Sequence, residues 1–219
     1  MAAGAEVIVP AHTFAATWMA VEAVGAVPVP VEVDPRTYTL DAAACAAAVT
    51  ARTAAIVPVS LYGHPVDLEP LMALAQRHGL FVLEDAAQSH GASYHGRRTG
   101  GGAHATAFSF YPTKNLGALG DAGAVTTNDA GLAEAVRRLR NYGSDQKYVH
   151  QTLGANSRLD ELQAAFLRVL LPRLDAANDR RRALAAAYDT ALADQVLSLP
   201  LWPAMPSENV GLVASALRA

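Results

Sequence analysis

The chain alternates short apolar runs with longer segments whose apolar residues recur at helical spacing. Six runs are continuously apolar or rich in β-branched residues, which is typical of strands buried on both faces. These predicted strands are 6–10, 27–33, 54–60, 80–85, 105–110 and 123–127. The predicted helices between them are 13–24, 41–50, 67–78 and 129–141. Such alternation predicts an α/β fold around a mostly parallel sheet.

Residues that favour helix ends flank these segments. Asp41, Asp67 and Asp129 stand where helix N-caps are expected, and Gly79 and Gly143 stand where helices are expected to stop. In sheets of this kind, ligands bind at the carboxyl ends of the strands. We therefore look for functional residues just after the strands.

The pattern changes after the last predicted strand. "RLDELQAAFLRVLLPRLDAANDRRRALAAAYDTAL" predicts two helices broken at Pro172, with no strand between them. After residue 194 the chain shows little periodicity. We expect a sheet domain over 1–157 that lacks its N-terminal part, because the chain opens almost directly into a strand, and a helical arm over 158–219 that leaves this domain.

Composition narrows the class of protein. Of 219 residues, 52% are hydrophobic and 17% charged, which indicates a globular chain. A net charge of −3 gives no reason to expect a nucleic acid or membrane partner, and "RRLR" at 137–140 is interpreted as a solvated helix face. No apolar run approaches the roughly 20 residues of a membrane span.

The cysteine content bears on location. Cys45 is the single cysteine and lies in "DAAACAAAV", where it is interpreted as a small helix residue and not a nucleophile. One cysteine excludes a disulfide framework and suits a reducing compartment. We expect a cytoplasmic protein.

One stretch combines features that need a chemical explanation. In "FSFYPTKNLGALGDAG" (108–123), Lys114 lies in a glycine-rich loop that follows a strand ending at Ser109. Asp85 ends another apolar strand, and Phe14 follows the first one. An amine, a carboxylate, a hydroxyl and an aromatic ring at strand ends suit pyridoxal phosphate. Its aldehyde condenses with lysine, its ring nitrogen needs an acidic partner, its ring stacks, and its phosphate takes donors.

Other chemistries fit less well. "GGGAHA" at 100–105 matches a dinucleotide-binding pattern, but it leads into a strand and not a helix, so we expect a turn. "GALGDAG" lacks the Lys-Ser/Thr pair of a P-loop. His90, His95 and His104 have no metal-ligand spacing, and no metal is expected.

Three motifs extend this interpretation. "EDAAQSHGASYHGRRTG", "FSFYPTKNLGALGDAGAV" and "GANSRLDELQAA" resemble the DegT/DnrJ/EryC1/StrS family of sugar aminotransferases, and the resemblance covers about residues 6–194. It implies the large domain of the type I aminotransferase fold, pyridoxal 5'-phosphate as cofactor, and a homodimer with shared active sites. Lys114 argues against a branch of dehydratases that resembles this family but carries histidine in place of the lysine.

The resemblance also implies residue roles. Lys114 holds the cofactor covalently and moves a proton during the reaction, and Asp85 faces the ring nitrogen. Phe14 stacks on the ring, Gln88 bonds the ring hydroxyl and Ser109 binds the phosphate.

The resemblance implies further roles near the partner subunit or the substrate. Asn156 would reach the phosphate in the partner subunit's site. Weaker candidates near substrate or interface are Thr13, Tyr111, Tyr148 and Arg158.

The implied reaction is transamination of a nucleotide-activated keto-sugar, with glutamate as amino donor. "YPTKNLGALGDAGAV" and "LRNYGS" are most similar to enzymes that aminate the 3-keto carbon of dTDP-deoxyhexoses, in antibiotic or glycan biosynthesis. Amination at C4, or of a cyclitol ketone, is the alternative. A catalytically weak or dead remnant, or a binding subunit, is another.

Two departures from the family support that last alternative. The family's Gly-Thr helix N-terminus, a strong phosphate site, has no counterpart before "EVIVP". The ending "PLWPAMPSENVGLVASALRA" also matches poorly, so the resemblance implies that the C-terminal small domain within 158–219 is incomplete. We expect a fragment, a truncated reading frame or a degenerate copy. Such a chain would bind the cofactor weakly and expose apolar surface on the arm at 158–193.

Overall fold

The structure is a computed structural model that describes residues 3–191 and 202–218. It divides into two compact units, 1–167 and 168–219, which are described separately.

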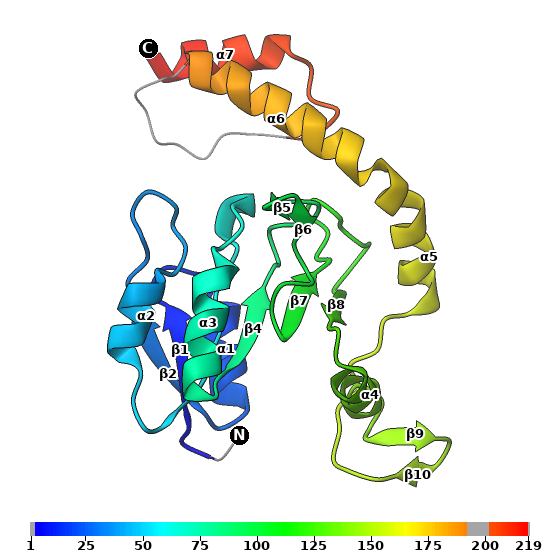
Figure 1. Ribbon diagram of the computed structural model, residues 1–219. Helices are drawn as coiled ribbons and strands as arrows, with labels where there is room; N and C mark the ends of the chain where they lie inside the picture. Colours follow the sequence, from blue (N-terminus) through cyan, green and yellow to red (C-terminus); the bar gives the residue numbers. More distant parts are fainter. Residues whose placement is uncertain (1–2, 192–201, 219) are drawn as a thin grey trace. The chain divides into compact units, whose positions relative to one another are not determined.

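A six-stranded sheet forms the first unit (Figure 1). Its strands, in spatial order, are β2 (Val27–Val31), β1 (Glu6–Pro10), β3 (Thr53–Ile56), β4 (Phe81–Asp85), β7 (Ala105–Ser109) and β8 (Gly123–Thr126). The first five pair in parallel, and β8 pairs with β7 antiparallel. The predicted strands and the mostly parallel sheet are confirmed, although β2 and β3 end earlier than predicted.

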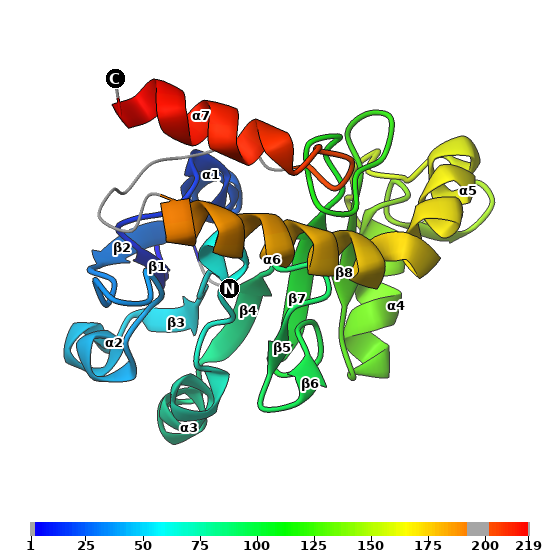
Figure 2. The ribbon, with the colours of Figure 1, turned by 90° about the horizontal axis from the view of Figure 1, so that it is seen from above.

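Helices cover both faces of this sheet, as Figure 2 shows. They are α1 (Ala15–Ala23) on one face, α2 (Ala42–Ala48) and α3 (Leu68–His78) on the other, and α4 (Ala130–Leu139) after β8. Alternate residues of β1 serve the two faces. Ile8 packs in the cluster with α2 and α3, whereas Val7 and Val9 pack in the cluster with α1. Both clusters are buried, which explains the continuously apolar strands.

The predicted helix ends are only partly right. Asp41 accepts hydrogen bonds from the Ala43 and Ala44 amides, and Asp129 accepts one from Leu132. Gly79 ends α3 in the left-handed conformation, at φ 65°. These three predictions are confirmed.

The other two predicted helix ends have different outcomes. Asp67 is the N-cap residue of α3, as predicted, although its side chain makes no capping bond and its carboxylate accepts from the Tyr94 hydroxyl instead. The prediction for Gly143 was wrong. Gly143 does not end α4, which stops at Leu139 with Arg140 as its cap. Gly143 instead takes φ 73° in the turn that follows, and its amide donates to the Arg138 carbonyl oxygen.

Short elements that the sequence patterns did not predict complete the first unit. These are the hairpin strands β5 (Ser93–Tyr94) and β6 (Arg97–Arg98), the hairpin strands β9 (Ser144–Gln146) and β10 (Val149–His150), and the 3₁₀ turn η1 (Leu61–Gly63). Residues 100–104 form a turn before β7, as expected for "GGGAHA".

The arm contains α5 (Glu161–Leu170), the 3₁₀ turn η2 (Leu171–Arg173), α6 (Leu174–Ala191) and α7 (Glu208–Arg218). The predicted break at Pro172 is confirmed, since η2 contains it. The sequence patterns predicted no helix after residue 194. The structure has one there, α7, which packs on α6 around Leu184, Met205 and Val210 (Figure 1). Leu162, Val169 and Leu171 are 75%, 56% and 55% exposed, so the expected apolar surface on the arm is present.

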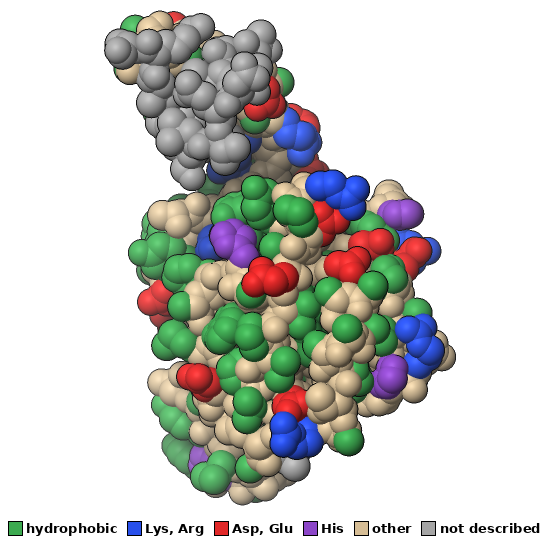
Figure 3. Space-filling model, turned by 90° about the vertical axis from the view of Figure 1, so that its left-hand side faces the viewer, with side chains coloured by type: hydrophobic (Ala, Val, Ile, Leu, Met, Phe, Trp, Pro, Cys, Tyr) green, Lys and Arg blue, Asp and Glu red, His purple; other side chains and the backbone are tan. Residues whose placement is uncertain are grey.

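The surface shows no gathering of one charge sign on the face drawn in Figure 3, where basic and acidic side chains are interspersed. Among the residues that the structure describes, no helix is both long enough and apolar enough to cross a membrane.

Candidate functional site

Two neighbouring carboxylates on β4 point to opposite faces of the sheet. Glu84 is fully buried and accepts bonds from the hydroxyls of Ser60 (2.7 Å) and Thr106 (3.2 Å). Asp85 is half-buried at the strand's carboxyl end. Its Oδ2 accepts from Thr17 Oγ1 at 2.9 Å and its Oδ1 accepts from the Ala87 amide at 3.0 Å. The carboxylate of Asp85 therefore has the donor partners that its position requires.

The end of the next strand, β7, brings together Ser109, His90 and Lys114. The Ser109 hydroxyl accepts from the Tyr111 amide at 3.3 Å, and the Ser109 carbonyl oxygen lies 2.7 Å from His90 Nε2. Burial lowers the pKa of His90, the bond to Ser109 opposes that shift, and the charge of Lys114 lowers the pKa further.

Glycines allow the loop that carries Lys114 to fold tightly. The Lys114 amide donates to the Tyr111 carbonyl oxygen at 2.8 Å, and the Ala118 amide donates back to Phe110 at 2.7 Å. A Cβ on Gly117 would lie 2.5 Å from the Pro112 carbonyl oxygen, and one on Gly123 would lie 2.8 Å from that of Phe108. Because only glycine tolerates these approaches, the glycines shape the loop and hold Lys114 after the strand.

A cavity of about 410 Å³ opens beside Asp85, between α1 and the sheet. Thr17, Asp85 and Ser109 supply polar groups to its lining, and apolar side chains of α1, β3, β4 and β7 supply most of the rest. The Thr13 hydroxyl lies 3.0 Å from that of Thr17, so a polar chain runs from Thr13 to Asp85. Phe14, the residue before α1, has its ring 72% exposed.

Gln88 lies three residues after Asp85, beyond the end of β4, and is bonded to the turn η1 that follows β3. Its Oε1 accepts from the Tyr62 amide at 2.6 Å, which directs the oxygen toward η1. The amide nitrogen of Gln88 is therefore directed away from that bond, with two donor hydrogens.

The remaining candidates lie beyond β7, and three of them are in the segment 141–158, called the excursion below. Asn156 forms an isolated antiparallel β-bridge with Asn141, and its Oδ1 accepts from Arg158 Nε at 3.1 Å. The Arg158 guanidinium lies over the Tyr142 ring, 5.3 Å from its centroid. Tyr148 is 83% exposed, with Lys147 over its ring. Tyr111 is half-exposed in the lysine loop. Asn156, Arg158 and Tyr148 thus contact residues of the segment 141–158, and these contacts do not connect them to Asp85 or Ser109.

Two site residues were missed by the sequence patterns. Thr17 reaches Asp85 across 68 positions, and His90 reaches Ser109 across 19. The spacing of Thr13 and Thr17, four apart at the start of a helix that begins at the site edge, could have indicated the first. His90 was considered only as a metal ligand. Within residues 3–191 and 202–218, no three His, Cys, Asp or Glu side chains are placed to hold a metal ion.

Comparison with known proteins places the chain among aminotransferases. It is 63% identical over 191 residues to the erythromycin biosynthesis sensory transduction protein EryC1 of Saccharopolyspora erythraea, covering 87% of this chain and 52% of that protein. It is 60% identical over 190 residues to dTDP-3-amino-3,4,6-trideoxy-alpha-D-glucose transaminase of Streptomyces venezuelae, covering 87% of this chain and 50% of that protein. The chain thus spans about half the length of these curated relatives.

A solved structure agrees with these relatives. The crystal structure of S. venezuelae DesV in complex with a ketimine intermediate superposes with a TM-score of 0.86 at 55% identity, covering 93% of this chain and 57% of that one. The fold is therefore that of the type I aminotransferases, as expected. Residues 1–201 match the DegT/DnrJ/EryC1/StrS aminotransferase family, and the chain belongs to it.

Proposed function

We propose that this chain takes part in transferring an amino group from glutamate to a nucleotide-activated keto-sugar, with pyridoxal 5'-phosphate as cofactor. The substrate we favour is a dTDP-3-keto-6-deoxyhexose, in deoxyaminosugar biosynthesis for an antibiotic or glycan. One observation carries the proposal. Asp85, which Thr17 and the Ala87 amide hold in place, is the last residue of β4. Ser109 is the last residue of the neighbouring strand β7, and Lys114 lies in the loop that follows it.

The residues fit this cofactor. Each oxygen of Asp85 accepts one hydrogen bond in the structure, and a carboxylate has capacity for more, including one from a ring N–H. The exposed ring of Phe14 offers a stacking plane at the same edge. Gln88, with its oxygen held by Tyr62, has amide hydrogens to donate to a ring hydroxyl. The Ser109 hydroxyl accepts from Tyr111 and can donate its own hydrogen to a phosphate oxygen.

Each side chain then has a separate task. When bound, the cofactor supplies an electron sink that stabilises a carbanion. Lys114 Nζ would bond covalently to the cofactor until the amine of the amino donor displaces it, and the freed Nζ would then take the proton from Cα of that donor. Asp85 keeps the ring nitrogen protonated, so the sink stays effective. Thr17 and the Ala87 amide keep the Asp85 carboxylate in position for this task.

The partner assignments are part of the same proposal. We propose a homodimer in which Asn156 contacts the phosphate in the partner subunit's site, and in which Arg158, Tyr148, Tyr111 and Thr13 lie near substrate or interface. The support is the exposure of the excursion 141–158, where Leu153 is 93% exposed and Tyr148 83%. We also propose a cytoplasmic location, which suits a single free cysteine.

Covalent labelling of the lysine tests the proposal. The chain is incubated with pyridoxal phosphate, reduced with borohydride and digested, and the peptides are weighed by mass spectrometry. We expect the cofactor mass on the peptide that contains Lys114. The Lys114→Ala variant should keep its circular dichroism spectrum and lose the label. Labelling of Lys147 in place of Lys114, or equal labelling of the variant, would reject the assignment.

A further inference from the structure

Three aromatic side chains meet at the carboxyl edge of the sheet. His12 follows β1, Tyr38 follows β2 and Tyr62 follows β3, three strands that lie side by side. The ring centroids are 5.8 Å apart for His12 and Tyr38, 6.1 Å for His12 and Tyr62, and 6.0 Å for the two tyrosines. His12 Nε2 lies 3.0 Å from the Tyr62 hydroxyl. We call these residues the aromatic trio. The two tyrosines are 43% and 68% exposed, so the trio presents rings and polar tips to solvent.

Both tyrosines of the trio have left-handed backbones. Tyr38 has φ 56° and Tyr62 has φ 55°, a region that residues with a Cβ seldom occupy. Such conformations persist only where the surroundings enforce them, and they cluster at ligand sites. Two of them on rings that touch each other call for an explanation beyond chain reversal.

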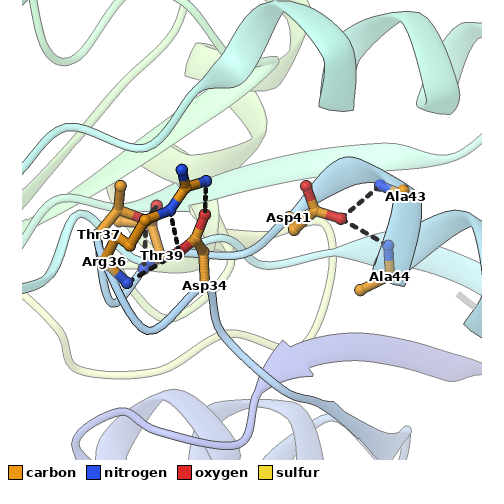
Figure 4. Close-up of polar contacts among 7 residues, drawn as sticks. All are labelled: Asp34, Arg36, Thr37, Thr39, Asp41, Ala43 and Ala44. Carbon is orange, nitrogen blue, oxygen red and sulfur yellow. Dashed lines mark hydrogen bonds and ion pairs between the residues drawn. The ribbon is translucent and has the colours of Figure 1, made fainter.

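The loop before Tyr38 is built to enforce its conformation (Figure 4). The Tyr38 amide donates to the Asp34 carbonyl oxygen at 2.7 Å, and the Asp34 amide donates to that of Thr39 at 3.0 Å. The Asp34 carboxylate accepts from the Arg36 amide at 2.8 Å and from its guanidinium at 2.7 and 3.1 Å. These bonds lower the pKa of Asp34 to about 2, so the ion pair between Asp34 and Arg36 is present at neutral pH. The hydroxyls of Thr37 and Thr39 lie 2.9 Å apart and close the turn.

Tyr62 connects the aromatic trio to the proposed cofactor site. Its amide donates to Gln88 Oε1 at 2.6 Å, and Gln88 is the residue assigned to the ring hydroxyl. His12 lies two positions before Phe14, the residue assigned to the ring face. The trio is therefore one hydrogen bond from one assigned cofactor contact and two residues from another. A ligand on the trio would lie beside the group that reacts.

We propose that the aromatic trio is a docking platform for the hexose ring of the amino acceptor. This inference rests on the proposed function. A hexose offers C–H faces that pack on aromatic rings, and hydroxyls that bond to phenol and imidazole groups. The reacting carbon belongs to the hexose, whereas the base is separated from it by the diphosphate. Proximity to Gln88 therefore favours the hexose over the base as occupant.

Fluorine NMR of the labelled chain tests the platform directly. The chain holds 7 tyrosines, so 3-fluorotyrosine gives few resonances, and Tyr38→Phe and Tyr62→Phe identify two of them. The cofactor-loaded chain is titrated with dTDP-glucose, which carries a hexose but no ketone, and separately with dTDP. We expect dTDP-glucose to shift the Tyr38 and Tyr62 resonances to saturation and dTDP to leave them in place. Tyr62→Leu should weaken dTDP-glucose binding by roughly tenfold. The matched Tyr94→Leu variant should bind as the parent does.

Three results would overturn the inference. Equal shifts with dTDP alone would place the base on the trio. Shifts that depend only on protein concentration would make the trio a contact with a second copy. Absence of any shift at Tyr38 and Tyr62 would mean that the hexose does not dock there. The proposed function is judged separately, from the cofactor label on Lys114, which needs no sugar.

Discussion

Glu84 and Asp85 are neighbours on one strand, yet their two faces of the sheet serve different purposes. The face of Glu84 is packed with α2 and α3, whose Leu71 and Leu74 are almost fully buried. Glu84 has no exposed surface and accepts one hydroxyl bond on each oxygen, at the wall of a cavity of about 980 Å³. The face of Asp85 is covered by α1 and opens into a cavity. The first face, called the closed face below, supplies most of the core and holds a fully buried carboxylate. The second, called the open face, holds a half-buried carboxylate that solvent and a ligand can reach.

The open face also carries less buried apolar surface. Phe81 and Val125 are 39% and 45% exposed, and every residue of the edge strand β8 is exposed. A large buried side chain stabilises the fold through transfer from water and through contacts that a cavity would remove. Substitutions on the two faces should therefore differ in what they damage. Substitutions on the closed face should lower the free energy of unfolding, and substitutions on the open face should lower the rate of amine transfer.

The largest effect on stability is expected from Leu74→Ala on the closed face. Leu74 is 1% exposed in the α2–α3 cluster, so its truncation should lower the free energy of unfolding by about 2–5 kcal/mol. Leu83→Ala, at a half-buried residue that lines the cavity, should cost only about 1–2 kcal/mol. Urea unfolding followed by circular dichroism gives both values. Equal losses would remove the distinction between the faces.

The next effect concerns rate and not stability. Asp85→Asn should keep cofactor attachment to Lys114 but lower the rate of amine transfer from glutamate by at least about a hundredfold, or ~2.7 kcal/mol. An amide cannot keep the ring nitrogen protonated, and the electron sink is weakened. Stopped-flow absorbance of the glutamate half-reaction measures this rate.

Glu84→Gln is the matched control on the other face. It should lower stability, because a buried amide replaces an acceptor of two hydroxyl bonds, and it should leave the rate within about threefold of the parent. An Asp85→Asn chain within threefold of the parent rate would count against the assigned role.

A smaller effect is expected from Thr17→Val. Valine keeps the branched shape but removes the donor to Asp85 Oδ2, so the carboxylate loses one of its two hydrogen bonds. A bond to a charged group contributes about 1.5–3 kcal/mol, and we expect a rate loss of about tenfold because water from the cavity replaces part of it. Thr17→Ser keeps the hydroxyl and should restore the rate. If serine is as slow as valine, the methyl group matters and the hydrogen bond does not.

The sequence patterns predicted what depends on local periodicity and on single favoured residues. The six strands, Asp41, Asp129, Gly79 and the break at Pro172 belong to this class. Asp67 is at the predicted N-cap, but its carboxylate bonds to Tyr94, which is 27 positions away and which local spacing could not indicate. The prediction that Gly143 ends a helix was wrong, because glycine with a positive φ occurs in turns as well as after helices.

The site shows the same division. Lys114, Asp85 and Ser109 could be chosen from the sequence because each stands at or just after the end of an apolar strand. Thr17, His90 and the aromatic trio depend on contacts between distant segments, and those contacts exist only once the strands have been ordered in the sheet. Local spacing carries no information on that order.

The smallest effect is a difference in reactivity between two thiols, and it compares the faces most directly. Cys45 lies on the closed face with no exposed surface. Burial first, and the Asp41 carboxylate second, raise its pKa to about 12 from an ordinary 9.0. The neutral thiol is therefore favoured in the fold, so its contribution to stability is present below pH 9 and is lost as the pH rises toward 12. At pH 8 the thiolate, which is the reactive form, is therefore strongly disfavoured in the folded chain. We expect Cys45 to react with Ellman's reagent only as fast as the α2–α3 face opens.

The matched variant carries its single thiol on the open face. Ala16→Cys in a Cys45→Ala chain places the thiol at the cavity, where it should react at the rate of a small exposed thiol. Equal rates for the two chains in the absence of urea would show that the closed face opens as readily as the cavity. The division between a stabilising face and a reactive face would then not hold.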